Sequence, residues 1–573
     1  MKKIFLALMA LATLASCDLS FFPSDELNDQ VLLSDESGAE YIMDGCYAYL
    51  KDEVEFLGYA SGNTFTRHYF QLTEFPADNT NLSAHTTDKL YEAAALVMSD
   101  DLKNVGTLWM IGYKVIYMTN TVIESTVEGV SAASDHLLGE AYFVRGWMHL
   151  NMVTLFSKPY SHGRDNLGIP LHISTNNPAP FRAKVGDVYD QIVKDLTKAS
   201  QLMGNSRGNK GYPSKETALG ILSRVYLYME NWDEVVNTVN TMLAGATPDS
   251  KLDKDLANYF INAKTSNETL FCIAHETTDT RGQSSIGSMY LKDGIGWGEI
   301  YPSDPLLYLY ERYPSDLRYA AFIHPQYVSD DLTVYFPVEA QEGGISEGRT
   351  YAVAPATPSG DNYTFTYEGT TYVAEKRLVQ GEYYEYWTTY KNEDVQVRVT
   401  RKVTPRVPYT VPMWYIAKFS YQEGKATVSY QDGKVQVSFE GGDPMLSSPV
   451  ISRWGEVILN RAEAYAHLGQ DAKAYEDVNV IRTRAGIPAE GMFSEANKHG
   501  YTSALDVVLD ERRLELAFEG HRTHDLIRNK KDIDRRFAGA HRWEVVPYTY
   551  DRLQYPIPNN EWTVSGIEQN PSY

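Results

Sequence analysis

Three groups of residues in this sequence have types and spacings that could carry out chemistry. The first is Gly344-Ile345-Ser346-Glu347-Gly348, which matches the nucleophile-elbow string of serine hydrolases. In those enzymes the serine occupies a sharp turn between a strand and a helix. Here a glycine-rich stretch precedes the string and no helical pattern follows it. The context therefore argues against a catalytic serine.

The second group is His521, His524 and Asp525, whose side chains are of types that bind zinc. They fall between two helical patterns, where such a polar run serves packing and capping, so we expect no metal there. The third group is the 75 acids of the chain. So many acids create carboxylate pairs by chance, and spacing alone cannot identify a glycosidase pair.

Several common catalytic and nucleotide-binding motifs are missing from the sequence. It has no Gly-Lys-Ser/Thr nucleotide loop, no dinucleotide fingerprint and no pair of histidines with a helical glutamate between them. We therefore expect that the protein is not an enzyme and that it needs neither metal nor cofactor.

Cys17 is the residue with the clearest chemical role. Lys2 and Lys3 precede an apolar run, Ile4 to Leu14, that is shorter than the ~20 residues needed to span a membrane. The run ends in Leu14-Ala15-Ser16-Cys17, the pattern of a bacterial lipobox. We expect cleavage before Cys17 and lipid attachment to it, with the lipid as the only membrane anchor. A plain secreted protein with a chance cysteine is the alternative.

The chain is strongly acidic. Its net charge is −23, and removing residues 1–16 takes away two lysines and no acid, which brings the charge to −25. Such a surface repels nucleic acid, so we expect no nucleic-acid partner. Cys46 and Cys272 could pair in an oxidising compartment, but two cysteines do not make a disulfide scaffold, and buried free thiols are favoured.

Helical periodicity dominates most of the chain. Apolar residues at three- and four-residue spacings between Ala39 and Leu50 predict a first helix. Segments 214–245 and 452–486 each read as a helix–turn–helix pair of the tetratricopeptide type, and such pairs must stack to bury their apolar faces. Further helices are predicted at 102–126, 135–157 and 186–203.

Residues 326–446 show short alternating patterns instead. Thr364 to Tyr367 and Tyr372 to Ala374 flank Glu368-Gly369, and Ala426 to Tyr430 and Val435 to Phe439 flank an Asp-Gly turn. Both patterns predict β-hairpins.

The predicted fold class is therefore mainly α, with tetratricopeptide-type helix pairs forming a scaffold and a loop-rich insertion with short β-hairpins. We expect one domain over residues 36–573, preceded by a signal peptide (1–16) and an acidic lipidated leader (17–35). The helical repeats are expected at about 36–260 and 447–530, and the loop- and β-rich, ligand-facing region at about 270–446.

The C-terminal region carries an ordered series of motifs. They are Trp454-Gly455-Glu456-Val457-Ile458-Leu459-Asn460-Arg461-Ala462-Glu463-Ala464-Tyr465, Ile481-Arg482-Thr483-Arg484-Ala485-Gly486, Glu511 to Arg522, Asp525 to Arg528, Tyr555-Pro556-Ile557-Pro558 and Gln569 to Tyr573. Together with the helix around Gly139 to Arg145 and the lipobox, this series resembles the SusD/RagB family of outer-membrane nutrient-binding lipoproteins. We expect the charged residues of these motifs to lock the last helices together rather than to contact ligand.

The resemblance implies a lipid-anchored protein on the outer-membrane surface of a member of the Bacteroidota. It would capture oligosaccharide or polysaccharide without cleaving it and deliver it to a SusC-like TonB-dependent transporter, which it covers as a lid. The ligand and the transporter are thus the expected partners, and no cofactor is implied.

The family offers no ligand motif to transfer, so the site residues are inferred from residue type and loop position. Aromatic faces can stack on sugar rings while amides and charges bind hydroxyls. The expected ligand-binding residues are Trp297, Tyr290 and Tyr301 in a glycine-flanked stretch, Arg67, Tyr69, Asp78, Asn79 and Asn81 after the first helix, and Tyr384, Tyr386 and Trp387 in the insertion. A purely structural role is the alternative for each aromatic residue.

Two other functions stay open. A member of the same family could bind peptide or glycopeptide instead, and a surface glycoside hydrolase is the remaining alternative. The sequence does not specify the sugar, because fructan, host glycan, plant polysaccharide and starch all present similar rings and hydroxyls.

Overall fold

The computed structural model describes residues 37–82, 89, 91–176, 181–291, 295–325, 327–340, 349–379, 384–403, 414–431, 434–537, 539, 541 and 544–573. The signal peptide, Cys17, the acidic leader, the Gly344–Gly348 string and the Asp432-Gly433 turn lie outside the described residues.

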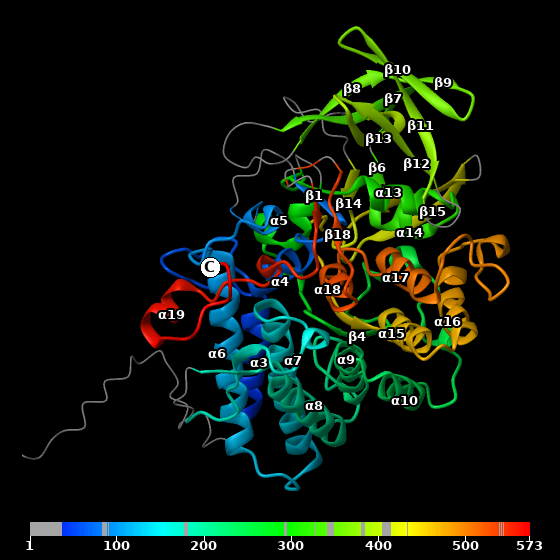
Figure 1. Cartoon of the computed structure of the whole chain (residues 1–573). Coiled ribbons are helices and arrows are strands. Elements are labelled where there is room, and N and C mark those ends of the chain that lie inside the picture. The colour runs from blue at the N-terminus through cyan, green and yellow to red at the C-terminus, as the bar shows by residue number, and fades with distance from the viewer. Residues whose placement is uncertain are drawn as a thin grey trace, which may run out of the picture.

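Long helices from the N-terminal half form one side of the helical body (Figure 1). Neighbours along the chain pack against each other from α6 to α10, and α3 packs against α6. The predicted helices are confirmed to within a few residues. They are α3 (Gly38–Lys51), α6 (Lys103–Ser125), α7 (Ala132–Phe156), α8 (Val185–Leu202), α9 (Lys215–Tyr228) and α10 (Trp232–Leu243). A further helix, α4 (Phe65–Glu74), was not predicted, and it carries Arg67 and Tyr69, which were expected in the loop after the first helix.

The two predicted helix–turn–helix pairs lie side by side although the insertion separates them in sequence. α15 (Trp454–His467) and α16 (Asp471–Arg484) form the second pair, and α15 packs against both α9 and α10. The turns of the two pairs contain Glu230 and Gly469, which both have positive φ (58° and 68°). α17 (Ala504–Glu515) and α18 (Arg522–Arg528) follow and pack onto α15 and α4 respectively.

The insertion contains a seven-stranded antiparallel sheet, which projects from one end of the helical body (Figure 1). Its strand order is β8-β7-β13-β12-β11-β10-β9. The strands are β7 (Tyr327–Ala340), β8 (Arg349–Pro355), β9 (Thr357–Ser359), β10 (Asn362–Tyr367), β11 (Thr370–Leu378), β12 (Tyr384–Tyr390) and β13 (Glu393–Val403).

Both predicted hairpins are confirmed. β10 pairs with β11, with Phe365 opposite Tyr372, and β15 (Lys425–Gln431) pairs with β16 (Lys434–Glu440), with Gln431 opposite Lys434. The insertion is nevertheless more regular than the predicted loops with short strands. β7 has 14 residues and pairs with β13, which lies more than fifty residues further along the chain, so the sequence gives no local sign of this pairing.

The sheet has its own small core, separate from that of the helical body. Val334, Phe336, Phe365, Val395 and Val397 are buried there. Many tyrosine rings surround this core and fill gaps between strands: Tyr363, Tyr367, Tyr372, Tyr386 and Tyr390. Part of the high tyrosine content therefore serves packing.

Short elements complete the described chain. None of the described helices combines the length and apolar character needed to cross a membrane. The short helices are α5 (Tyr91–Ala95), α11 (Leu256–Tyr259), α12 (Ile286–Tyr290), α13 (Asp304–Glu311), α14 (Leu317–Phe322) and α19 (Asn559–Ser565). The paired strands are β1 (Thr80–Leu82) with β5 (Ile300–Pro302), β2 (Leu167–Pro170) with β3 (Arg182–Lys184), β4 (Thr269–Cys272) with β17 (Val450–Arg453), β6 (Ile323–Pro325) with β14 (Trp414–Ile416), and β18 (Ile533–Asp534) with β19 (Val545–Val546).

Candidate functional site

The charged motif residues of α15, α17 and α18 lie inside the protein. Arg453 donates to Glu268 (2.8 Å), to Glu515 (2.6 Å) and to Glu519 (2.8 Å). The same buried ion-pair network includes Arg318, Lys418, Arg482, Arg484 and Glu511. Burial alone would raise the pKa of Glu519, but Arg453 and Lys418 outweigh it and lower the pKa to about 2. These residues hold the C-terminal helices together.

His521, His524 and Asp525 belong to the same interior. Asp525 accepts hydrogen bonds from Arg512 (2.8 Å) and Arg528 (2.6 Å), so guanidinium groups occupy its oxygens. Burial lowers the pKa of His521 to about 4 and that of His524 to about 3. Within the described part of the chain, no three His, Cys, Asp or Glu side chains are grouped as metal ligands.

Of the predicted ligand residues, Asp78 and Asn79 connect α4 to the C-terminal helices. Arg522 donates two hydrogen bonds to Asp78 (2.7 and 2.9 Å), and Arg513 donates to Asn79 (2.8 Å). Burial would raise the pKa of Asp78, but Arg513 and Arg522 hold it well below its usual range. Both side chains are buried, and so is the nearby Asn81. A ligand at the surface does not reach them in this conformation.

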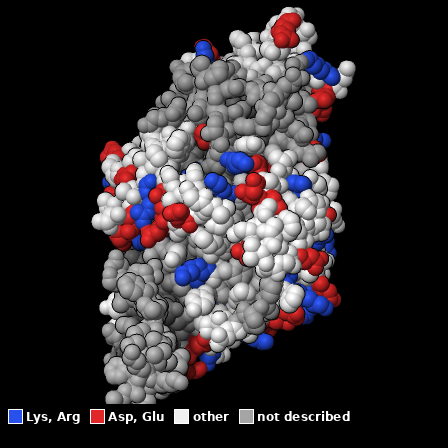
Figure 2. Space-filling view, turned by 90° about the vertical axis from the view of Figure 1, so that its left-hand side faces the viewer, with Lys and Arg blue, Asp and Glu red and all other residues white. Residues whose placement is uncertain are grey.

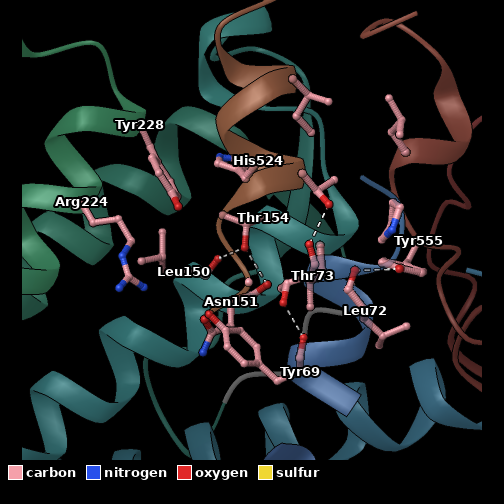
Figure 3. Close-up of a pocket in the computed structure, with 16 residues that line it drawn as sticks. Tyr69, Leu72, Thr73, Leu150, Asn151, Thr154, Arg224, Tyr228, His524 and Tyr555 are labelled. Atoms are coloured by element: carbon pink, nitrogen blue, oxygen red, sulfur yellow. Dashed lines mark hydrogen bonds between the residues drawn. The ribbon is translucent and has the colours of Figure 1, made fainter. Parts of the chain in front are cut away.

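Three predicted aromatic residues are also buried. Tyr290 and Tyr301 are at most 1% exposed, and the Tyr301 hydroxyl donates to the Gly298 carbonyl. Tyr69 lies beside an internal cavity of about 40 Å³ between α4, α7, α9 and α18 (Figure 3). Side chains of Asn151, Thr154, Arg224, Tyr228, His524 and Tyr555 surround this cavity. It has room for water but not for a sugar ring.

Trp297 differs from these residues because it is both exposed and fixed. Its side chain is 46% exposed, while its indole Nε1 donates to the Gln283 carbonyl at 2.8 Å. Its backbone N–H donates to the Ser288 carbonyl at 2.6 Å. A Cβ on Gly296 would lie 2.1 Å from the Ser288 oxygen, so only glycine lets the chain approach α12 this closely. The Trp297 side chain is therefore held in place by its indole N–H while nearly half of its surface is exposed.

Polar side chains from the loop after α3 lie next to the Trp297 loop. Glu53 accepts a hydrogen bond from the Gly62 backbone N–H (2.7 Å) and one from Ser284, which directly follows Gln283. Burial would raise the pKa of Glu53, but these hydrogen bonds, with Arg281 and Arg67, lower it. The Arg67 guanidinium Nε lies 3.1 Å from the Met289 sulfur. The Glu53 carboxylate and the Arg67 guanidinium of α4 thus contact Ser284 and Met289, in the same segment that binds the indole through Gln283.

A small cavity of about 20 Å³ lies beside this group and is lined in part by Arg67, Arg281 and Ser284. Tyr59, on the same loop as Glu53, is 48% exposed, with the Lys103 ammonium 4.9 Å from its ring centre. Glu53, Tyr59 and Ser284 are not among the ligand residues predicted from the sequence. The glycines at 58 and 62 around Tyr59 are the signal that could have found this loop, since glycines also flank Trp297.

The third predicted group lies on β12 of the sheet. Tyr384 is 44% exposed, and the Lys376 ammonium lies 4.0 Å from its ring centre. Tyr386 packs against Tyr363, and the Trp387 indole donates to Glu385 (3.0 Å). Tyr384 is the most exposed of these three but carries a lysine over its ring, and Tyr386 and Trp387 are partly buried, so the three do not form one exposed platform.

Lysine and arginine are interspersed with aspartate and glutamate on the face of the molecule shown in Figure 2. The net charge of −23 is therefore not concentrated there in one acidic patch.

Comparison with known proteins shows the family. The family described as "SusD family" matches residues 267–573, more than half of the chain, and the family described as "Starch-binding associating with outer membrane" matches residues 25–227. The chain therefore belongs to the SusD family, and the resemblance inferred from its motifs is confirmed. Carbohydrate-binding proteins of this family are non-catalytic and are associated with the outer membrane.

Individual relatives cover nearly the whole chain at low identity. The chain is 23% identical to SusD-like protein P2 of Formosa agariphila, over 85% of this chain and 84% of that protein. It is 22% identical to SusD-like protein P38 of the same organism, over 96% of this chain and 95% of that protein. A SusD superfamily protein of Bacteroides thetaiotaomicron has a similar solved structure (TM-score 0.67, 21% identity, 94% of this chain and 99% of that one). A SusD-like carbohydrate binding protein of Bacteroides vulgatus also has a similar solved structure (TM-score 0.63, 17% identity, 92% of this chain and 96% of that one). These structures establish a mostly helical SusD-like fold with a β-rich insertion.

Proposed function

We propose that this protein captures glycan at the cell surface and passes it, uncleaved, to a SusC-like TonB-dependent outer-membrane transporter. Lipid on Cys17 would hold it on the outer face of the outer membrane. The observation that carries the proposal is Trp297, whose indole N–H and backbone N–H each donate a hydrogen bond and whose side chain is still 46% exposed. The carbohydrate-binding name of the Bacteroides vulgatus relative supports the same ligand class.

The proposed site combines one stacking surface with a polar edge. The C–H face of a pyranose would stack on the Trp297 indole, while Glu53 and Arg67 would bind hydroxyls of the same or the next ring. The indole N–H is already bonded to Gln283, so Trp297 offers a ligand only its face. Tyr59 would extend the stacking surface along the adjoining loop. The buried residues Tyr69, Asp78, Asn79, Asn81, Tyr290 and Tyr301 are not part of this proposed site.

Replacing Trp297 by alanine tests the site. We expect polysaccharide affinity to fall about tenfold or more, because a central aromatic contact is lost, and the melting temperature to stay unchanged. Affinity electrophoresis in gels that contain soluble starch, levan, arabinoxylan or mucin glycan measures binding. Trp562→Ala is the matched control, since Trp562 is also exposed and its indole also donates one hydrogen bond, to Asp100 (3.0 Å).

The same experiment separates the competing functions. Equal retardation of the wild type and the Trp297→Ala variant would remove Trp297 from the site. Shorter products from a labelled glycan would indicate a glycosidase, and capture of peptides from a protein digest in place of glycans would indicate the peptide-binding alternative. Protease treatment of intact cells that make the wild type or Cys17→Ala tests the location, and co-purification with a TonB-dependent transporter tests the partner.

A further inference from the structure

Two segments of the chain supply the charges around Trp297. They are residues 51–67, which include Glu53 and Tyr59, and residues 279–299, which include Trp297 itself. Together these segments contain four basic and six acidic residues. A site for uronic acids or sulfate esters needs an excess of basic groups, because arginine and lysine are the side chains that bind such anions. The sequence around Trp297 has the opposite balance.

Basic residues of the two segments already face carboxylates of the same segments. The Lys51 ammonium lies 2.5 Å from the Asp279 carboxylate, and Arg281 is paired with Asp52. Arg281 also donates to the Lys51 carbonyl at 3.2 Å, which connects the two pairs. A cation in such a pair attracts the carboxylate of a ligand only weakly, because the charge of its partner offsets its own.

Glu53 adds a negative charge close to the indole. Its carboxylate accepts hydrogen bonds from the Gly62 backbone N–H (2.7 Å) and from Ser284, and Ser284 directly follows Gln283, whose carbonyl binds the indole N–H. Partial burial acts to raise the pKa of Glu53, but these hydrogen bonds and two nearby arginines lower it. Glu53 is therefore ionised at neutral pH.

A neutral sugar and an acidic sugar meet these groups differently. A sugar hydroxyl donates to a carboxylate and accepts from a guanidinium, so it suits a site that holds both. A uronate or sulfate group on the same ring cannot donate, and it lies close to the Glu53 charge. Glu55, which is exposed two residues further along the loop, adds a second negative charge on this side.

We propose that the Trp297 site selects uncharged polysaccharides over those that carry uronic acids or sulfate esters, and that Glu53 determines this preference. The inference rests on the proposed function, since it names the ligand class of the same site. A hydroxyl of a neutral sugar donates to the Glu53 carboxylate, whereas a carboxylate or sulfate at the same place is repelled by it.

Derivatives of one polysaccharide that differ in charge test the selection. Soluble starch, levan and arabinoxylan are each compared in a carboxymethyl form, which adds carboxylates, and in a hydroxyethyl form, which adds an uncharged group of similar size. At low salt, calorimetry should show the carboxymethyl form binding about threefold more weakly, the effect of two like charges about 6 Å apart in water. High salt should reduce this difference by screening.

Glu53→Gln tests the residue. This variant removes the charge but keeps an oxygen that can accept from Gly62, and it should bind the two derivatives with equal affinity. Glu490→Gln is the matched control, because it removes an exposed carboxylate from the segment after α16, and it should leave the difference unchanged. The same difference in Glu53→Gln as in the wild type would overturn the role of Glu53.

The wild-type comparison decides the selection even if Glu53→Gln lowers the melting temperature. Equal affinity of the wild type for the two derivatives at low salt would overturn the selection and leave glycan capture intact. Tighter binding of polygalacturonate or chondroitin sulfate than of every neutral polysaccharide would do the same. No binding of any of these polysaccharides would overturn both the selection and the proposed function.

Discussion

The buried ion-pair network and the Trp297 loop use polar residues in opposite ways. Around Arg453, charged groups are fully buried and each is bonded to several partners, so they determine how the C-terminal helices pack. Around Trp297, a few polar groups stand at the surface beside one exposed ring. The residues that mark the family are thus structural, and the residues proposed for the ligand, Arg67 of α4 and the loop residues Glu53, Tyr59 and Trp297, lie outside those motifs. Family membership therefore predicts the scaffold well and the ligand poorly.

The largest expected effect comes from breaking the network. Arg453→Met leaves Glu515 and Glu519 without a main partner in the interior, and loss of one member of a buried pair costs about 3–5 kcal/mol. Urea unfolding should show a decrease of that size in the free energy of unfolding. Arg377→Met is the control, because Arg377 also bonds to two carboxylates, Asp394 and Glu375, but on the exposed sheet surface. It should change stability by less than about 1 kcal/mol, and equal effects of the two variants would contradict the distinction between the regions.

Lowering the pH should destabilise the fold, because the buried carboxylates of this ion-pair network become protonated. The pKa of Glu519 is lowered from 4.5 to about 2, and those of Glu515 and Asp525 are also lowered. A carboxylate with a lowered pKa in the folded state stabilises the fold above its unfolded pKa, and this contribution is lost as pH falls towards the folded pKa. The free energy of unfolding should therefore decrease between pH 4.5 and about 2, and less steeply in Arg453→Met. A constant value across this interval would refute the prediction.

The smallest effect is expected at the cysteines. Cys46 and Cys272 are both free and buried, and burial raises the pKa of Cys272 to about 12, so neither is a reactive thiolate at neutral pH. A reducing agent should leave the melting temperature unchanged. Alkylation followed by mass spectrometry should label these two cysteines only after denaturant is added, whereas rapid labelling of the native protein would show that the core around α3 or β4 opens.

The sequence predicted the parts of the fold that depend on local pattern. Helical periodicity located α6 to α10, and the Glu368-Gly369 and Asp-Gly turns located both hairpins. It could not predict pairing between distant segments, so the long β7–β13 pairing was missed.

The same limit applies to the site. Asp78 and Asn79 are polar residues in the segment after the first helix, which predicted contact with the ligand, but their arginine partners lie more than 430 residues away in the chain. The glycine-flanked aromatic pattern predicted an exposed ring at Trp297, and its exposure is observed. Its role in binding stays a prediction.

The bonds between α4 and the C-terminal segment also set the order in which the protein can fold. Asp78 is paired with Arg522, and the Tyr555 hydroxyl donates to the Leu72 carbonyl at 2.8 Å across 483 positions of the chain. During synthesis the apolar interior of the first helices therefore stays uncovered until the last residues of the chain have been made. Contacts over such separations slow folding and leave apolar surface uncovered in the meantime. A chain that stops before residue 555 would keep most of its helices and still lack the segment that seals them.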